Sequence, residues 1–372
     1  MVTGTLLSTS FLVGGAQNSV QVGMDRLGAD ILILPQDYVI KGQSVLLTGK
    51  PTTFAFQDSV LSRVKSIPGI AVASPQLYIG TLQNQGCCAT DLQLIGIDPE
   101  NDFTIQSWLE SELGRPLGKD ECIVGFGIIG PVGTILKFYG HEYTVAGRLD
   151  PSGMGMDASI FIRMEDAYTM SEESGWKAVS PVGIREGQIS AVLVRVEPGA
   201  DKEAVAQKIR ETVPSAYPFT VSHVATKVNS QLSLATEVLT AVTAAVTLVS
   251  IPFIALISTM VANERRRELA LLRAMGATRL FIFSAVFSES LLLAALGGLA
   301  GIGISGLLLS LFEPLITGTL QVPFLWPSLW TIAGDAAVAI FLAVGIGGAA
   351  SLYPAYRSST MDPYEAIRRS EL

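Results

Sequence analysis

Residues 263–279 read NERRRELALLRAMGATR, and the three consecutive arginines of this stretch stand between two of the most apolar runs in the chain. The run before it, residues 234–261, contains a single acid and no Lys or Arg, and the run after it, residues 280–312, has the same composition. A third run of this kind covers residues 329–353. Each run exceeds the roughly 20 residues that cross a bilayer, so we predict three transmembrane helices here.

The composition of the 372-residue chain is that of a membrane protein. Hydrophobic residues make up 49% of it and charged residues only 16%, whereas about a quarter of the residues in a soluble domain are charged. The net charge of −8 argues against a nucleic-acid partner, because no basic surface is available to neutralise phosphates. We therefore expect membrane lipid, and no nucleic acid, among the partners.

The opening residues, MVTGTLLSTSFLVGGA, are also apolar, but this run ends at residue 16. No Lys or Arg precedes Arg26, so the basic leader of a signal peptide is missing, and a spanning helix needs more length. We expect a short first membrane helix and its stalk in residues 1–28, continuing through QNSVQVGMDRLG beyond the membrane surface. We also expect that the chain begins inside this helix, through truncation or a misplaced start.

Residues 29–228 have a different texture, because short β-rich runs alternate with clusters of Gly, Pro, Asn and Asp. Strands are predicted in residues 29–35, 91–97, 141–149, 158–164 and 189–196, which indicates a folded α+β domain. Its last part, from residue 189 to 224, reads as strand, helix, strand. The apolar residues Ala204, Val205, Ile209 and Val213 are expected on one face of that helix.

The distribution of positive charge predicts the topology. Five Arg residues lie in or beside the loop at 263–279, and Arg357, Arg368 and Arg369 follow the last span, whereas the loop at 313–328 contains no Lys or Arg. Short loops rich in Lys and Arg stay in the cytoplasm. Both arginine-rich segments are then inside and residues 29–228 outside, which requires an even number of spans and makes the short opening helix the fourth.

The quoted stretch itself predicts an amphipathic helix. Leu269, Leu271, Leu272 and Met275 share one broad face, Arg266 and Arg273 lie opposite, and Gly276 is placed to end the helix. Two interpretations stay open. Residues 265–267 anchor the end of a membrane helix, or the whole segment lies along the membrane and contacts a cytoplasmic partner.

Catalytic chemistry finds little support in the sequence. SVLLTGKPTT, residues 44–53, has a Gly-Lys pair, but a phosphate-binding loop needs Gly at Ser44 and Ser or Thr at Pro51. His141 and His223 are the only histidines, which excludes a His-rich metal site and disfavours a His-based triad. We expect each at the surface or in a turn, and we expect no catalytic residue, metal or cofactor.

Cysteines and small residues leave alternatives open. The three cysteines, Cys87, Cys88 and Cys122, permit one disulfide with one thiol left over, and their spacing does not assign it. Gly297, Gly301 and Ser305 form a stripe that lets helices approach closely, within one subunit or across a dimer. Glu289 lies inside a predicted span, where we expect it to make a structural polar contact rather than to move ions.

Several segments, taken together, resemble the FtsX/MacB-type permeases of ABC transporters. The stretch NERRRELALLRAMGATRLFIF is similar to their cytoplasmic loop, YPAYRSSTMDPYEAIRR to their C-terminal signature, and SESLLLAALGGLAGIGISG to their third helix. DRLGADILILP, LQLIGIDPEN, YTVAGRLDPSGMGMDASIFI and VLVRVEPGADKEAV resemble the extracytoplasmic core domain of the MacB branch. The similarity covers nearly the whole chain, in the order and spacing of the family.

The resemblance implies an α-helical, multi-pass protein of the cell (inner) membrane. Its four transmembrane helices, the first short or truncated, carry a large extracytoplasmic α+β domain between helices 1 and 2. The domains would be residues 1–28, the MacB-like core 29–228, and the FtsX-like membrane domain 229–372 with a coupling helix at 264–276. The residues expected to couple to the ATPase are Arg265, Arg266, Arg267, Glu268, Leu269, Leu271, Leu272, Arg273, Met275 and Gly276.

The same resemblance implies a non-catalytic permease subunit that works with a separate ABC ATPase and pairs with a second permease copy or homologue. MacB carries its ATPase ahead of the first helix, and we expect this chain to depart from that plan. ATP hydrolysis would then move the outer domain for export or extraction of a substrate, with an extracytoplasmic adaptor or substrate protein as a further partner. The alternative is an FtsX-like subunit that activates an extracytoplasmic enzyme; a membrane-anchored enzyme is a weaker third hypothesis.

Overall fold

The computed structural model describes residues 2–81, 92–105, 113, 115–315 and 324–360. The chain divides into two compact units. One, the helical unit, comprises residues 1–14, 232–315 and 326–372, and the other, the sheet unit, comprises residues 15–231 and 316–325. The long apolar runs lie in the first unit and the β-rich runs in the second.

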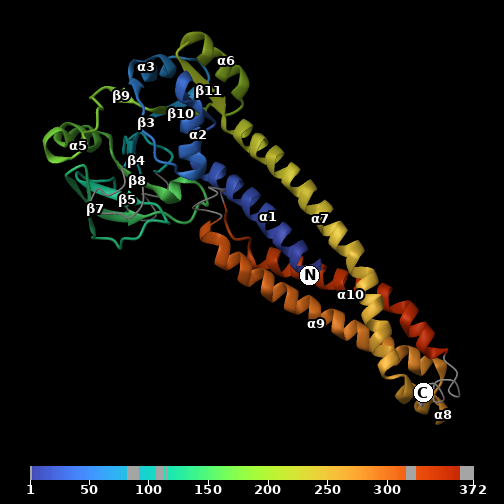
Figure 1. Cartoon of the computed structure of the whole chain (residues 1–372). Coiled ribbons are helices and arrows are strands. Elements are labelled where there is room, and N and C mark those ends of the chain that lie inside the picture. The colour runs from blue at the N-terminus through green and yellow to red at the C-terminus, as the bar shows by residue number, and fades with distance from the viewer. Residues whose placement is uncertain (1, 82–91, 106–112, 114, 316–323, 361–372) are drawn as a thin grey trace. The chain divides into compact units, whose positions relative to one another are not determined.

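The sheet unit is built on a nine-stranded sheet with the order β11-β1-β10-β3-β4-β8-β5-β7-β6 (Figure 1). Most neighbouring strands are antiparallel, and β4 with β8 and β5 with β7 are parallel. The strands are β1 Ile31–Pro35, β3 Ile70–Gly80, β4 Gln93–Ile97, β5 Glu121–Val124, β6 Ile135–Phe138, β7 His141–Arg148, β8 Ser159–Arg163, β10 Ala191–Val196 and β11 Ala216–Thr220. A second sheet pairs β2 Phe56–Gln57 with β9 Gln188–Ile189. Each of the five strands predicted from the sequence is confirmed within its run.

Both faces of the central strands are covered. The helices of this unit are α2 Val39–Thr48, α3 Ser59–Lys65, α5 Met164–Lys177 and α6 Lys202–Thr212, with short 3₁₀ turns η1 Gln36–Tyr38 and η2 Gly155–Ala158. On β1, Ile31 and Ile33 pack in the cluster that includes α3 and α6, and Leu32 and Leu34 pack in the cluster on the other face. A strand buried on both faces reads as a continuous apolar run, which explains the sequence ILIL.

The predicted strand–helix–strand segment is confirmed as β10, α6 and β11, with a difference in pairing. β1 lies between β10 and β11 and pairs antiparallel with each of them, so the unit is split by a strand from the start of the domain. The N-terminus of α6 is capped by Asp201, whose carboxylate accepts a hydrogen bond of 3.0 Å from the backbone N–H of Glu203. The turn in EPGAD therefore starts the helix, as its sequence indicates.

The predicted apolar face of α6 is wrong for one residue, Ala204. Val205, Ile209 and Val213 are buried, but Ala204 is exposed and Ala206 is buried in its place. Successive residues of a helix are rotated by about 100°, so the three buried residues centre the face on the side of Ala206. Ala204 points about 140° away from that centre.

The helical unit contains the three membrane spans predicted from the sequence. Its helices are α7 Val221–Glu264, α8 Arg266–Ala274, α9 Arg279–Pro314 and α10 Leu329–Ser359, and α7 begins in the sheet unit. The parts long and apolar enough to cross a membrane are Thr236–Glu264, Arg279–Phe312 and Leu329–Ser359. α1, Val2–Leu27, is one continuous helix shared by the two units. A fourth span in α1 stays a prediction.

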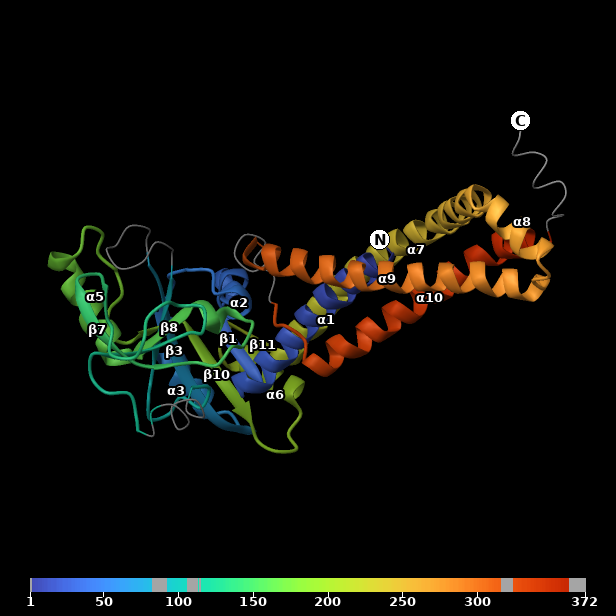
Figure 2. The same cartoon turned by 90° about the horizontal axis from the view of Figure 1, so that it is seen from below.

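Small residues let α9 and α10 lie along each other, as Figures 1 and 2 both show. A Cβ atom built on Gly347 of α10 would stand 2.5 Å from the Cβ of Ala294 on α9, and one built on Gly298 of α9 would stand 3.4 Å from the Cβ of Ala343. No larger side chain fits at Gly347 without a shift of the helices. The close approach of the two backbones therefore depends on these residues.

Candidate functional site

The arginine-rich stretch forms a short helix, α8, at the end of α7 (Figure 1). The predicted helix over 264–276 differs from the structure at its start, because Glu264 is the last residue of α7 and the chain breaks direction at Arg265, with φ −89° and ψ 12°. Arg265 takes part in the hydrogen bonding of both helices, since its N–H donates to the carbonyl of Val261 at 3.2 Å and its carbonyl accepts from the N–H of Leu269 at 3.1 Å. α8 is therefore a kinked continuation of the long helix.

The C-terminal end of α8 is closed by a Schellman motif. The N–H of Gly276 donates to the carbonyl of Arg273 at 3.0 Å, and the N–H of Ala277 donates to that of Leu272 at 3.0 Å. Gly276 has a φ of +103°, a conformation that a residue with a Cβ rarely adopts. The glycine thus ends the helix and turns the chain toward α9.

One side of α8 exposes apolar side chains. Leu271 is 48% exposed, Leu272 is 37% exposed and Met275 is 76% exposed, and we call these three residues the apolar stripe. Arg267 and Glu268 are exposed beside the stripe. A single exposed leucine is ordinary on a protein surface, but three large apolar side chains in one stripe of a short helix are typical of a docking face.

The opposite side of α8 faces the other helices of its unit. Ala270 is 4% exposed, and Leu269, Arg266 and Arg273 are half-buried. Leu269 therefore lies closer to the inner side than the sequence predicts. Within the described residues, Arg266 Nε is buried without a hydrogen-bond partner. Arg266 and Arg273 thus turn inward and Leu271 and Leu272 outward, the reverse of a helix on a soluble domain.

Two of the arginines contact neighbouring helices. Arg265 Nη1 donates to Glu289 Oε1 on α9 at 2.9 Å, and Arg273 Nη1 donates to the carbonyl oxygen of Ser359 on α10 at 2.6 Å. The sequence predicts a polar contact for Glu289 without naming its partner. Arg265 and Glu289 lie twelve residues before and after Ala277, so a hairpin centred on this turn would have placed them at one level.

The three residues of the predicted glycine stripe have different surroundings. A Cβ on Gly301 would collide with Thr3 Oγ1 of α1, whereas one on Gly297 would have nothing within 4 Å. Ser305 is 3% exposed, and its Oγ lies 2.8 Å from Ser8 Oγ. Two of the three residues therefore contact α1 within the subunit.

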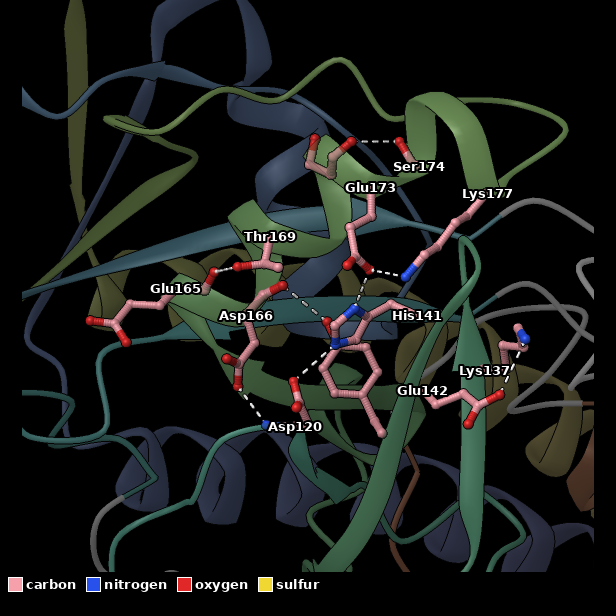
Figure 3. A network of polar contacts seen from close by, with 12 residues as sticks. Asp120, Lys137, His141, Glu142, Glu165, Asp166, Thr169, Glu173, Ser174 and Lys177 are labelled. Carbon is pink, nitrogen blue, oxygen red and sulfur yellow. Dashed lines mark hydrogen bonds and ion pairs between the residues drawn. The ribbon is translucent and has the colours of Figure 1, made fainter.

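His141 follows the hairpin turn between β6 and β7, where it pairs with Phe138, so the turn alternative of the prediction is confirmed. Its side chain is only 11% exposed and lies between two carboxylates (Figure 3), which the sequence does not predict. His141 Nε2 is 2.9 Å from Asp120 Oδ1, and Nδ1 is 2.8 Å from Glu173 Oε2. Tyr143 packs against its ring. The charged partners lie on α5 and in the turn before β5, so sequence separation hid them. The side chain of His223 lies outside the described residues.

The ionisable groups around His141 are held in place by one another. Lys177, which donates to Glu173 at 2.8 Å, lowers the pKa of the Glu173 carboxyl, and His141 lowers it further. Burial raises the pKa of Asp166. Within the described residues, no group of three or more His, Cys, Asp or Glu side chains could hold a metal ion. The cluster is a network of polar contacts on the sheet unit, which includes the Lys177–Glu173 ion pair.

Two further sequence features find their places in the sheet unit. The Gly-Lys pair of residues 49 and 50 follows the C-terminus of α2, where Gly49 is the αL cap, whereas a phosphate-binding loop leads into the N-terminus of a helix. Cys122 is a buried, free thiol on β5, and burial raises its pKa to about 12. Cys87 and Cys88 lie outside the described residues.

Comparison with known proteins matches both parts of the chain. Residues 3–212 match the MacB-like periplasmic core domain, and residues 240–363 match the FtsX-like permease C-terminal domain. An uncharacterized ABC transporter permease of Methanocaldococcus jannaschii is 24% identical over 99% of this chain and 92% of its own length.

One further relative is longer than this chain, and one solved structure aligns with only part of it. The macrolide export ATP-binding/permease protein MacB of Bdellovibrio bacteriovorus is 23% identical over 98% of this chain, which spans 58% of that protein. Among solved structures, the periplasmic region of MacB from Actinobacillus actinomycetemcomitans aligns with 55% of this chain and 95% of its own, at 10% identity and a TM-score of 0.35.

Proposed function

Because this chain belongs to the FtsX/MacB family of ABC transporter permeases, we propose that it couples ATP hydrolysis by a separate ATPase to movement of its outer domain. The protein is a membrane permease with an extracytoplasmic domain of the MacB type. Beyond this, we propose which partner the permease binds, where that partner binds and in which direction force travels.

The apolar stripe of α8 carries the proposal. Leu271, Leu272 and Met275 are exposed on a short helix that is attached to the rest of its unit by the opposite side. The positive-inside rule puts this helix on the cytoplasmic side of the membrane. An amphipathic helix with three exposed apolar anchors fits a hydrophobic groove on a partner protein. We assign the stripe as the docking site of the ATPase, with Arg267 and Glu268 at its rim.

We further propose that α1 is the fourth span and that the domains run 1–28, 29–228 and 229–372. Polar contacts between α1 and the other helices of the unit support this. Ser8 Oγ pairs with Ser305 Oγ at 2.8 Å, and Ser10 Oγ donates to Asp335 Oδ2 on α10 at 2.6 Å. Such contacts are common between helices that share a membrane.

The mechanism we propose is mechanical. A dimer of this chain, or a pair with a homologue, would receive the closing motion of two ATPase subunits through α8 and pass it to the outer domain, which would act on a substrate or on an extracytoplasmic adaptor. Export is favoured over signalling because the outer domain matches the MacB-like core. FtsX-like activation of an extracytoplasmic enzyme is the second candidate, and the match of residues 240–363 favours it.

The test is reconstitution of the full chain in lipid nanodiscs with and without an ABC ATPase from the same organism. We expect no ATP hydrolysis by the chain alone and stimulated hydrolysis by the complex. Robust hydrolysis by the isolated chain would refute the assignment. Crosslinking from outside intact cells separates the two candidates, since capture of an adaptor supports export and capture of a cell-wall hydrolase supports signalling.

A further inference from the structure

Both ends of α8 are attached to membrane spans by arginine side chains. Arg265, at the N-terminal end, pairs with Glu289 of α9, and Arg273, near the other end, donates to Ser359, the last residue of α10. Ala270, between them, is buried on the same side. The two contacts bridge α8 to two different helices, while the apolar stripe on its other side stays bare.

The length of α9 places Glu289 close to the inner boundary of the membrane. The helix has 36 residues, about 54 Å at 1.5 Å per residue, against a hydrocarbon core of about 30 Å. Glu289 lies about 15 Å along the helix from Arg279, and the remainder is long enough to cross the core. An unpaired carboxylate at such a depth is costly. The guanidinium of Arg265 offsets this cost.

The second contact satisfies the end of a helix. The last four carbonyls of a helix lack an intrahelical donor, and the negative end of the helix dipole attracts cations. The carbonyl of Ser359 is one of these groups, and Arg273 supplies both a donor and a positive charge at 2.6 Å. This contact depends on where α10 ends, so it fixes α8 against a defined point of that span.

We propose that Arg265 and Arg273 are positioning residues, which clamp α8 onto α9 and α10 so that a force on the apolar stripe moves both spans together. The inference rests on the proposed function, because it needs an ATPase that pushes on the stripe. It assigns these two arginines to the inner side of the coupling site, away from the ATPase itself. Arg265 is itself 54% exposed, so its contact with Glu289, and not burial, assigns it to the inner side. Arg267, which is exposed beside the stripe, remains available to the partner.

Two other roles would use the same arginines differently. They could bind acidic lipid headgroups, or they could pair with acidic residues of the ATPase. In either case Glu289 would not matter for the effect of Arg265, and an arginine at position 289 would not compensate for its loss. Exchange of the two charges therefore distinguishes the clamp from both.

The experiment uses the full chain in nanodiscs with its ATPase. Arg265→Glu and Glu289→Arg each place like charges side by side, and each is expected to lower the stimulation of ATP hydrolysis about fivefold or more, while the ATPase is still captured through the intact stripe. The double exchange is expected to recover to within about twofold of the wild type, because the coupling of a contacting pair is not additive. Melting temperature and gel filtration in detergent check that each variant is folded.

Milder variants keep the test decisive if a charge reversal fails to insert. With Arg265→Gln and Glu289→Gln, the second neutralisation should add little once the first is made. Arg273→Lys keeps a donor for Ser359 and should retain more stimulation than Arg273→Met. Additive effects at the pair, or no recovery on exchange, would overturn the clamp. A wild-type chain that stimulates no ATPase would overturn the proposed function as well, which is a different result from a working wild type with a failed exchange.

Discussion

Replacing Leu272 by aspartate in the apolar stripe should weaken ATPase binding without unfolding the chain. Full burial of a leucine side chain is worth about 1.5–3 kcal/mol, and Leu272 is already largely covered, with 37% exposed. Docking therefore gains only about 0.5–1 kcal/mol from its apolar area. The aspartate adds the cost of an unpaired carboxylate, about 1–3 kcal/mol or more. We expect a loss of about 2–4 kcal/mol, or roughly 30- to 1,000-fold in Kd.

Two variants calibrate this expectation. Ala274→Asp adds the same charge on an exposed residue about 200° around the helix from Leu272, so it should leave Kd within about threefold of the wild type. Met275→Ala removes apolar area from a side chain that is 76% exposed and adds no charge, which should cost about 1 kcal/mol, or roughly fivefold in Kd.

The assay is titration of the ATPase onto the full chain immobilised in nanodiscs, with membrane insertion of each variant checked by protease protection. The expected order of Kd is Leu272→Asp weakest, Met275→Ala intermediate and Ala274→Asp near the wild type. A correctly inserted Leu272→Asp chain that binds the ATPase as tightly as the wild type would show that the stripe is not the docking site. The arginines would then be left as a membrane anchor.

Three further predictions concern the rest of the chain. In a cysteine-free background, Val179→Cys, at a residue 97% exposed, should be labelled by an impermeant reagent from outside and Met275→Cys should not; the reverse pattern would invert the topology. The pKa of Glu173 is lowered by Lys177 and then by His141. Its carboxylate therefore contributes stability above its ordinary pKa, and this stability is lost as the pH falls through its folded pKa. Lys177→Met should flatten the fall in melting temperature between about pH 5 and pH 3, and an unchanged slope would contradict this. Gly301→Val collides with Thr3 and should cost about 1–3 kcal/mol of stability in detergent, whereas Gly297→Val, with open space around it, should melt like the wild type.

The sequence was sufficient for features that repeat along the chain. Three runs longer than a bilayer is thick predicted spans, and the β-rich runs at residues 29–35 and 189–196 were recognisable because strands buried on both faces are dominated by Ile, Leu and Val. The resemblance to a known family then supplied the order of the domains. The boundaries of α6 followed from a cap at Asp201.

Apart from Ala204, which was misplaced on its own helix, the features that the sequence did not reveal share one physical cause, which is partners brought from far along the chain. Nothing near His141 in sequence announces that Asp120 and Glu173 will enclose it, since one precedes a strand and the other lies on a later helix. The position of β1 between β10 and β11 is likewise a long-range choice. The contacts of Arg265 and Arg273 depend on where α9 and α10 place an acid and a helix end, so a helical wheel alone could not name their partners.

Because β1 pairs with β11, the resistance of the sheet unit to force depends on the direction in which the force is applied. α1 leads into β1 and β11 leads into α7, and the two attachments lie at the same end of this strand pair, where Ile31 pairs with Thr220 and the N–H of Val221 donates to the carbonyl of Asp30 at 2.9 Å. A load applied along both helices in one direction moves β1 and β11 together, so it is carried in shear by the hydrogen bonds between β1 and β10. A load that spreads the helices sideways falls on the bond at Asp30 first and then peels the pairs apart one by one. We therefore expect the sheet unit to resist force along the helices better than force that spreads them apart.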